Sequence, residues 1–125
     1  MTDHPKDYMS HHVESNCLIV KVKSHFDERN CFQVQNDILG LLEKEPAHLL
    51  LDLNDVCTIR SSGLRVILSI TKDFQNKKEK FFIVYSKNDD NQQVSQILKV
   101  SGFTKIISIC ATIEEAIKYC SVTPS

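Results

Sequence analysis

The spacing of apolar residues changes several times along the first half of the chain, and each change predicts a different element. Within residues 13–24, Val20 and Val22 alternate with lysines, which is typical of a half-buried strand. From residue 30 to residue 42 the apolar residues recur at helical spacing, and Pro46 ends that pattern. The continuous apolar run over residues 49–53 is typical of a central strand covered on both faces, although a buried helix would give the same short run.

The alternation of strands and helices continues toward the C-terminus. The pattern predicts a helix, a buried strand, a helix, a short strand and a last helix, over residues 61–75, 81–85, 92–100, 106–109 and 112–119. Gly102 suits the left-handed turn that ends a helix, and Thr112 with Glu115 matches the capping box that opens one. Because helices separate the later strands, we expect a single α/β domain with a mixed, mostly parallel sheet of four or five strands packed against about four helices.

The length of the chain leaves room for one domain. A compact fold of one sheet layer with its helices fits 125 residues. We expect a flexible polar N-terminus over residues 1–12, the folded domain over residues 13–120 and a C-terminal tail over residues 121–125. The N-terminus lacks the apolar core of a signal peptide, and no apolar run approaches the roughly 20 residues that span a bilayer. These features predict a cytoplasmic protein that does not contact membranes.

Charge and cysteine usage argue against several classes of function. The 15 basic and 16 acidic side chains give a net charge of −1, whereas a nucleic-acid binder needs clustered Lys and Arg. The five cysteines, an odd number with no CxxC pair, fit neither a disulfide framework nor a zinc site, and we interpret them as reduced thiols. We therefore expect no nucleic-acid partner, no metal and no other cofactor.

Candidate chemistry concentrates where the central strand leads into the next helix. The helix is predicted to open with Arg60-Ser61-Ser62-Gly63-Leu64. A helix start carries unpaired backbone N–H groups and a partial positive charge, so a serine there is a natural cap and also a site where an added phosphate is stabilised. Neither serine is followed at the third position by Glu or Gln, so the capping box is incomplete. Both interpretations stay open on these residues alone.

Other polar residues have a structural and a functional interpretation. Asp27 is either part of the start of the first helix or a contact for a partner. Asp52 and Asp55 suggest a carboxylate pair, but no third ligand accompanies them, and a strand end and a loop explain them better. A nucleophilic Cys57 would need a histidine such as His48, and no sequence signature places the two together. An enzyme is the least supported class of protein.

Several segments of the chain together resemble those of a known family. They are the strand end Leu51–Val56 with the helix start Arg60–Leu64, the later segment Ser101–Ile107, and the pair Phe26-Asp27 before the first helix. Together these segments resemble the STAS domain family, in particular the bacterial anti-sigma factor antagonists, over most of the chain. The resemblance implies a single STAS-like domain.

The resemblance also implies a non-catalytic regulator that switches partners. In that family the unphosphorylated antagonist binds an anti-sigma factor that is also a serine kinase, and this frees the sigma factor. The kinase phosphorylates the antagonist, and a serine phosphatase restores it. Ser61 matches the phosphoacceptor of the family. The partner contacts that the resemblance implies are Asp27, Arg60, Ser62, Gly63 and Leu64.

Arg60 departs from the family pattern. It stands where the family usually has an acid immediately before the phosphoacceptor, which reverses a charge at the centre of the implied docking face. Arg60 would either serve a variant partner with acidic groups or neutralise a phosphate on Ser61. The alternative function is a STAS regulatory subunit of another complex, a transporter or a nucleotide-sensing regulator, that is not phosphorylated. A single glycine at the junction, with no Gly-rich phosphate loop, argues against nucleotide binding.

Overall fold

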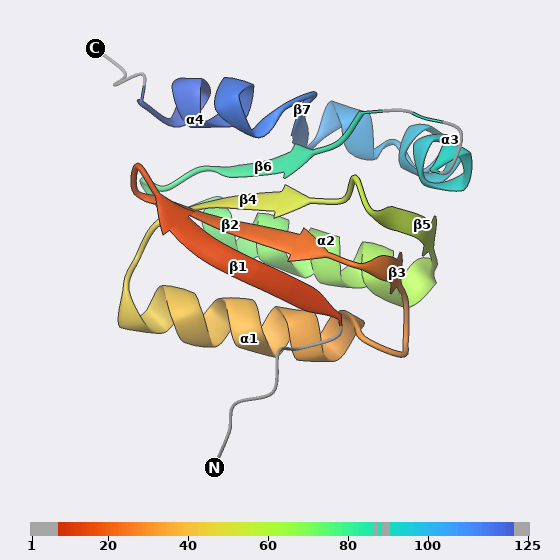
Figure 1. Cartoon of the computed structure of the whole chain (residues 1–125), viewed down its shortest axis with the longest axis horizontal. Coiled ribbons are helices and arrows are strands. Elements are labelled where there is room, and N and C mark those ends of the chain that lie inside the picture. The colour runs from red at the N-terminus through yellow and green to blue at the C-terminus, as the bar shows by residue number, and fades with distance from the viewer. Residues whose placement is uncertain (1–7, 87, 89–90, 122–125) are drawn as a thin grey trace.

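A five-stranded sheet forms the centre of the computed structural model, which describes residues 8–86, 88 and 91–121 (Figure 1). In spatial order the strands are β1 (Met9–Glu14), β2 (Cys17–Val22), β4 (His48–Asp52), β6 (Phe81–Val84) and β7 (Ser108–Cys110). β1 pairs antiparallel with β2, and the other pairs in this sheet are parallel. This mixed, mostly parallel sheet, with four α-helices among the described residues, confirms the predicted fold class.

The middle strands are apolar on both faces because helices cover both sides of the sheet. In β4, Leu49 and Leu51 belong to one cluster of buried side chains, and Leu50 belongs to a second cluster on the opposite face. Both edges of β4 are paired, since Leu50 lies opposite Ile19 of β2 and Phe82 of β6. The continuous leucine run is therefore a central strand, as the sequence predicts, and not a buried helix.

Helices α1 (Cys31–Lys44) and α2 (Ser61–Phe74) pack against each other and bury their apolar sides in the first cluster. Helix α4 (Ile113–Ser121) covers the opposite face, and its Ala116 packs into the second cluster (Figure 1). Helix α3 (Gln92–Val100) is followed by the short 3-10 helix η1 (Phe103–Lys105). Among the described residues, no helix has the length and apolar character needed to cross a membrane.

A second, two-stranded sheet leads into α2, and the sequence did not predict it. β3 (Ser24–Phe26) and β5 (Val56–Ile59) pair in parallel, and α3 packs against β5. Only the two end residues of β5 are buried, so its apolar pattern is too short to distinguish a strand from a loop. This small sheet carries the chain from β4 to α2 and thereby determines where α2 begins.

The first and last strands of the main sheet begin elsewhere than the sequence predicts. β1 begins at Met9, inside the segment expected to be flexible, because backbone pairing with β2 holds it while its later side chains stay exposed and leave no apolar pattern. Residues 1–7 and 122–125 lie outside the described part of the chain. β7 begins at Ser108 instead of Ile106, whose side chain is 57% exposed, because η1 and a turn occupy the preceding residues.

The turn chemistry predicted beside the last two helices is present. Gly102 has the left-handed backbone that ends α3, with a φ of 76°. The amide of Glu115 donates a hydrogen bond to the Thr112 hydroxyl at 3.1 Å, as expected at the start of α4. In both places the local sequence determines where an element ends or begins.

Candidate functional site

Helix α2 follows β5 through a single extended residue. Arg60, at φ −128° and ψ 177°, joins the two elements. Its N–H donates to the carbonyl of Phe26 in β3 at 3.2 Å, and its own carbonyl accepts from the Leu64 amide at 3.0 Å. The structure thus places Ser61 and Ser62 in the first turn of α2, where the sequence predicts them.

The first turn of α2 has no capping side chain. Arg60 occupies the cap position and makes no side-chain hydrogen bond to the helix start, and the first turn contains no acidic residue. Because α2 begins at Ser61, neither Ser61 nor Ser62 occupies the cap position, and the interpretation of the serines as caps is wrong. The positive end of the helix is therefore electrostatically suited to an added negative charge.

Ser61 and Ser62 differ in exposure and in their neighbours. Ser61 is exposed, whereas Ser62 is half-buried. Burial raises the pKa of the Cys31 thiol, and a hydrogen bond with the Ser62 side chain partly opposes this rise. Ser62 thus links the starts of α1 and α2, while Ser61 lies on the surface.

Gly63 lets α2 approach β3 closely. A Cβ atom at this position would lie 2.3 Å from the carbonyl oxygen of Phe26 and 2.9 Å from its ring atom Cδ2. Since protein interiors are close-packed, only glycine fits here without a movement of α2. Gly63 is buried, and the neighbouring Leu64 is packed in part against the core. Gly63 shapes the expected docking face but offers it no side chain.

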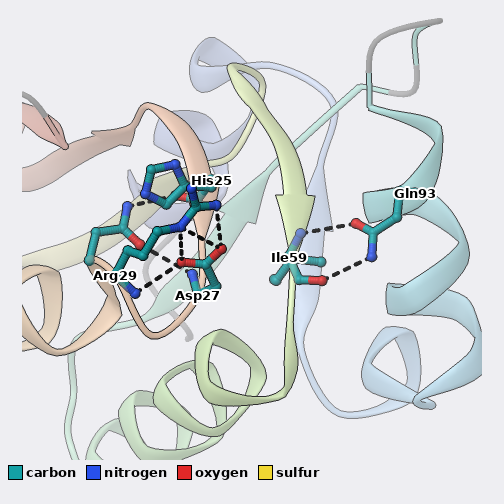
Figure 2. Close-up of polar contacts among 6 residues, drawn as sticks. His25, Asp27, Arg29, Ile59 and Gln93 are labelled. Atoms are coloured by element: carbon teal, nitrogen blue, oxygen red, sulfur yellow. Dashed lines mark hydrogen bonds and ion pairs between the residues drawn. The ribbon is translucent and has the colours of Figure 1, made fainter.

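Asp27 lies between β3 and α1 and is paired with Arg29 (Figure 2). Its Oδ1 accepts from the Arg29 backbone N–H at 3.0 Å and from Nε at 3.1 Å, and its Oδ2 accepts from Nη2 at 2.8 Å. The side-chain hydrogen bonds from Arg29 outweigh the opposing effect of burial and lower the pKa of Asp27 to about 2. The Asp27 side chain is 1% exposed and that of Arg29 is 62% exposed, so a partner would meet the arginine first.

Asn30, which the sequence analysis did not single out, holds the same turn. Its Oδ1 accepts from the Asp27 N–H at 3.1 Å, and its Nδ2 donates to the His25 carbonyl at 2.6 Å. The Asp27 carbonyl in turn accepts from the amides of Asn30 and Cys31. Asp27 therefore shapes the start of α1, which is one of the two roles expected for it. An asparagine directly before a helical apolar pattern is the signal that would have indicated Asn30.

The N-terminal ends of α1 and α2 present a mixed basic and apolar surface. Phe32, in the first turn of α1, is 54% exposed and follows Cys31, the neighbour of Ser62. The sequence analysis missed Phe32 because it stands off the buried stripe of α1. We call this surface the junction face and define it by Arg29, Phe32, Arg60, Ser61 and Leu64.

A side chain of α3 supports β5 directly before the junction face. Nε2 of Gln93 donates to the Ile59 carbonyl at 2.9 Å, and Oε1 accepts from the Ile59 N–H at 2.9 Å (Figure 2). The amide of Gln93 thus satisfies both backbone groups of the residue that precedes Arg60. Because 34 positions separate Gln93 from Ile59, no local pattern predicts this contact.

The residues of the alternative chemistries are not brought together. Asp52 accepts from a loop amide at 2.9 Å, while Asp55 forms a separate ion pair with a lysine of β2. His48 begins β4, whereas Cys57 lies in β5, beyond the other end of that strand. Within residues 8–86, 88 and 91–121, no three His, Cys, Asp or Glu side chains gather in an arrangement that could hold a metal ion.

Known proteins share this architecture. A sequence model of the STAS domain matches residues 8–116. TM1081 of Thermotoga maritima, a proposed anti-sigma factor antagonist, has a TM-score of 0.80 at 22% identity, over 93% of this chain and 97% of its own. An anti-sigma factor antagonist of Mycobacterium paratuberculosis has a TM-score of 0.78 at 18% identity, over 91% and 93%. The Bacillus cell fate determinant SpoIIAA, in its phosphorylated form, has a TM-score of 0.65 at 14% identity, over 89% and 97%.

At these identities the solved structures show a shared fold. The family match is broader evidence, because it extends from the residue before β1 into α4 and includes the whole junction between β5 and α2. The chain therefore belongs to the STAS domain family.

Proposed function

We propose that this chain is an anti-sigma factor antagonist, a cytoplasmic, non-catalytic regulator whose partner binding is controlled by phosphorylation of Ser61. The observation that carries the proposal is an exposed serine in the uncapped first turn of α2. In the proposed cycle the unmodified chain binds an anti-sigma factor that is also a serine kinase, and a serine phosphatase restores the modified chain. The similar SpoIIAA exists in unphosphorylated and phosphorylated forms, which supports a cycle of this kind.

The physical basis of the switch is a change of charge on a preformed surface. A phosphate on Ser61 adds roughly −1.5 to −2 charges and three strong acceptor oxygens. The N–H groups of the first turn and the helix dipole stabilise this charge on the folded chain. Burying the same charge against a docked partner requires its desolvation, so phosphorylation lowers the affinity without refolding.

Arg60 determines which partner the junction face fits. The side chain is exposed and directly precedes Ser61, and Arg29 adds a second exposed guanidinium. A partner that docks here must therefore present acidic groups, because like charges at an interface oppose binding. In the phosphorylated chain, Arg60 is available to pair with the phosphate and so to stabilise the released state.

Intact-protein mass spectrometry after incubation with ATP and a candidate anti-sigma factor kinase tests the proposal. We expect the wild-type chain to gain one phosphate and the Ser61→Ala variant to gain none. Ser62→Ala is the matched control, because it removes the half-buried neighbouring hydroxyl and leaves Ser61 in place. Equal phosphorylation of the wild-type chain and Ser61→Ala would show that the switch is not at Ser61.

A further inference from the structure

The outer edge of β7 has no partner strand among the described residues, since β7 ends the strand order and pairs with β6 alone. The Tyr85 N–H donates to the Cys110 carbonyl at 2.9 Å, so Cys110 directs its backbone groups toward β6. Successive residues of a parallel strand direct these groups to opposite sides, and the N–H and C=O of Ile109 therefore point away from the sheet. β7 offers one donor and one acceptor to an additional strand.

An open groove of about 940 Å³ follows this edge of the sheet. Part of its wall is a pair of rings, Phe82 of β6 and Tyr119 of α4, with centroids 6.0 Å apart and planes inclined by 21°. Ile106, which is 57% exposed, adds an aliphatic side chain, and Tyr119 is itself 51% exposed. Apolar surface beside an open strand edge is the arrangement with which sheet proteins bind extended peptides.

Charges of opposite sign line the two ends of the groove. Lys80 directly precedes β6 and Lys105 precedes β7, so both lysines lie at the N-terminal ends of these parallel strands. Nζ of Lys80 donates to the Tyr119 carbonyl at 3.2 Å, which holds this lysine beside the ring pair. Glu115 lies in the first turn of α4, after the C-terminal end of β7. The groove is therefore cationic at one end and anionic at the other.

We propose that this groove binds an extended segment of a partner protein, which adds to β7 as an antiparallel strand. The antiparallel direction brings the C-terminal end of the segment to the two lysines, where an acidic side chain or the terminal carboxylate pairs with them. A basic group near the other end of the segment pairs with Glu115, and an apolar side chain packs on the rings and Ile106. Because β7 has only three residues, the backbone contributes few hydrogen bonds, and the groove supplies most of the selectivity.

This surface is separate from the junction face. The lysines lie at the N-terminal ends of the parallel strands, whereas Ser61 follows β5, which the chain reaches from the C-terminal end of β4. The proposal therefore does not depend on phosphorylation of Ser61. One chain would be able to hold a second partner while the junction face is free or occupied.

Chemical-shift titration of the isotope-labelled chain tests the inference. The probe is a synthetic peptide of alternating Val and Thr residues with an N-terminal Lys, a C-terminal Asp and a free terminal carboxylate. We expect saturable shifts of the Ile109 and Ile106 amides, and about a tenfold weaker affinity for the Lys105→Glu variant. Lys118→Glu is the matched control, because it makes the same charge change on α4 outside the groove and should bind like the wild type.

Two further measurements distinguish a strand from other occupants. A peptide N-methylated at its central residue should lose binding, since it cannot donate to the edge of β7. Equal binding of the N-methylated peptide, or displacement of the peptide by citrate, would show an anion site and overturn the proposal. Concentration-dependent dimerisation that Lys105→Glu abolishes would show that a second copy of the chain is the occupant, and the absence of any shift at Ile109 would also overturn the proposal.

Discussion

Arg29 determines how the buried acid at the site affects both stability and recognition. Its guanidinium lies over Asp27, holds the acid ionised and stays in contact with solvent. The charged group of this pair that a partner would contact is therefore the guanidinium of Arg29, although the family resemblance points to Asp27. The local sequence does not indicate this pairing, and only the structure shows that the side chains of Asp27 and Arg29 pair with each other.

The first prediction concerns the pH dependence of stability through Asp27. Its pKa is about 2 in the folded chain and has the ordinary value of 3.8 when the chain is unfolded. Because the folded pKa is the lower one, the stabilisation is complete above the unfolded value and is lost as the pH falls toward 2. Asp27→Asn should lower the free energy of unfolding by about 1–2 kcal/mol at neutral pH. This is less than the full pKa difference implies, because solvent screens the charge of the exposed Arg29.

Urea unfolding at several pH values checks this prediction. The difference between the wild-type chain and Asp27→Asn should shrink over the acidic window, since a protonated aspartate resembles asparagine. Asp73→Asn, at an exposed position of α2, is the control and should show no comparable loss at neutral pH. A difference that stays constant down to the folded pKa would contradict the assignment.

The second prediction concerns mimicry at Ser61. Ser61→Asp adds one charge and fewer acceptor oxygens than a phosphate, so it should weaken partner binding only in part. Ser61→Ala should leave binding nearly intact, because the hydroxyl is exposed and caps nothing. Calorimetric titration with the anti-sigma factor measures both affinities. Equal loss of affinity in both variants would indicate a structural role for the hydroxyl instead of a charge effect.

At the scale of elements, the contact of α2 with β3 controls the position of the site. The third prediction is that Gly63→Ala destabilises the fold by about 1–3 kcal/mol, because a Cβ atom meets the backbone oxygen of Phe26 and α2 must shift. Gly40→Ala is the matched control in α1, where nothing lies within 4 Å of the added atom. That variant should gain up to about 1 kcal/mol from helix propensity. Urea unfolding of both variants measures the contrast, and equal effects would contradict the close approach.

Elements whose apolar residues follow a strand or helix pattern could be predicted from the sequence. Elements that are held by backbone pairing with distant segments could not. The leucines of β4 and the helical spacing in α1 show burial directly, so both were found. β1 and β5 are held by backbone pairing with distant segments and bury few side chains, so neither has a sufficient pattern. The same contrast holds for the candidate site. The local sequence predicts that Ser61 lies at the start of a helix, whereas the contacts of Arg29, Asn30 and Gln93 depend on the tertiary fold.

At the scale of the whole molecule, the net charge does not describe the charges that a partner meets at the junction face, where the exposed Glu28 lies beside Arg29 and Arg29 is paired with Asp27. The chain carries −1 overall, yet two exposed arginines lie on the junction face. Charges act over roughly 10 Å at moderate ionic strength, so an approaching partner responds to the charges of the local surface more than to the net charge of the chain. We therefore expect association with an acidic partner to slow as salt is added.

The fourth prediction tests this local charge. Arg60→Asp should weaken binding to the native partner by about tenfold or more, and it should improve binding to a family kinase that expects an acid at this position. Lys72→Asp, at the far end of α2, makes the same charge change away from the junction face and is the control. Surface plasmon resonance with both partners measures the effects. Unchanged affinity for both partners would place residue 60 outside the interface.

The amide of Gln93 has a consequence for the solubility of the chain. A strand whose N–H and C=O groups are free can recruit another chain and start aggregation. Gln93 occupies both groups of Ile59 as a neighbouring strand would, so a single side chain prevents the small sheet from growing at this residue. No further strand beside β5 is needed for this protection, so the adjoining start of α2 stays uncovered. The same contact keeps concentrated protein from self-association at Ile59.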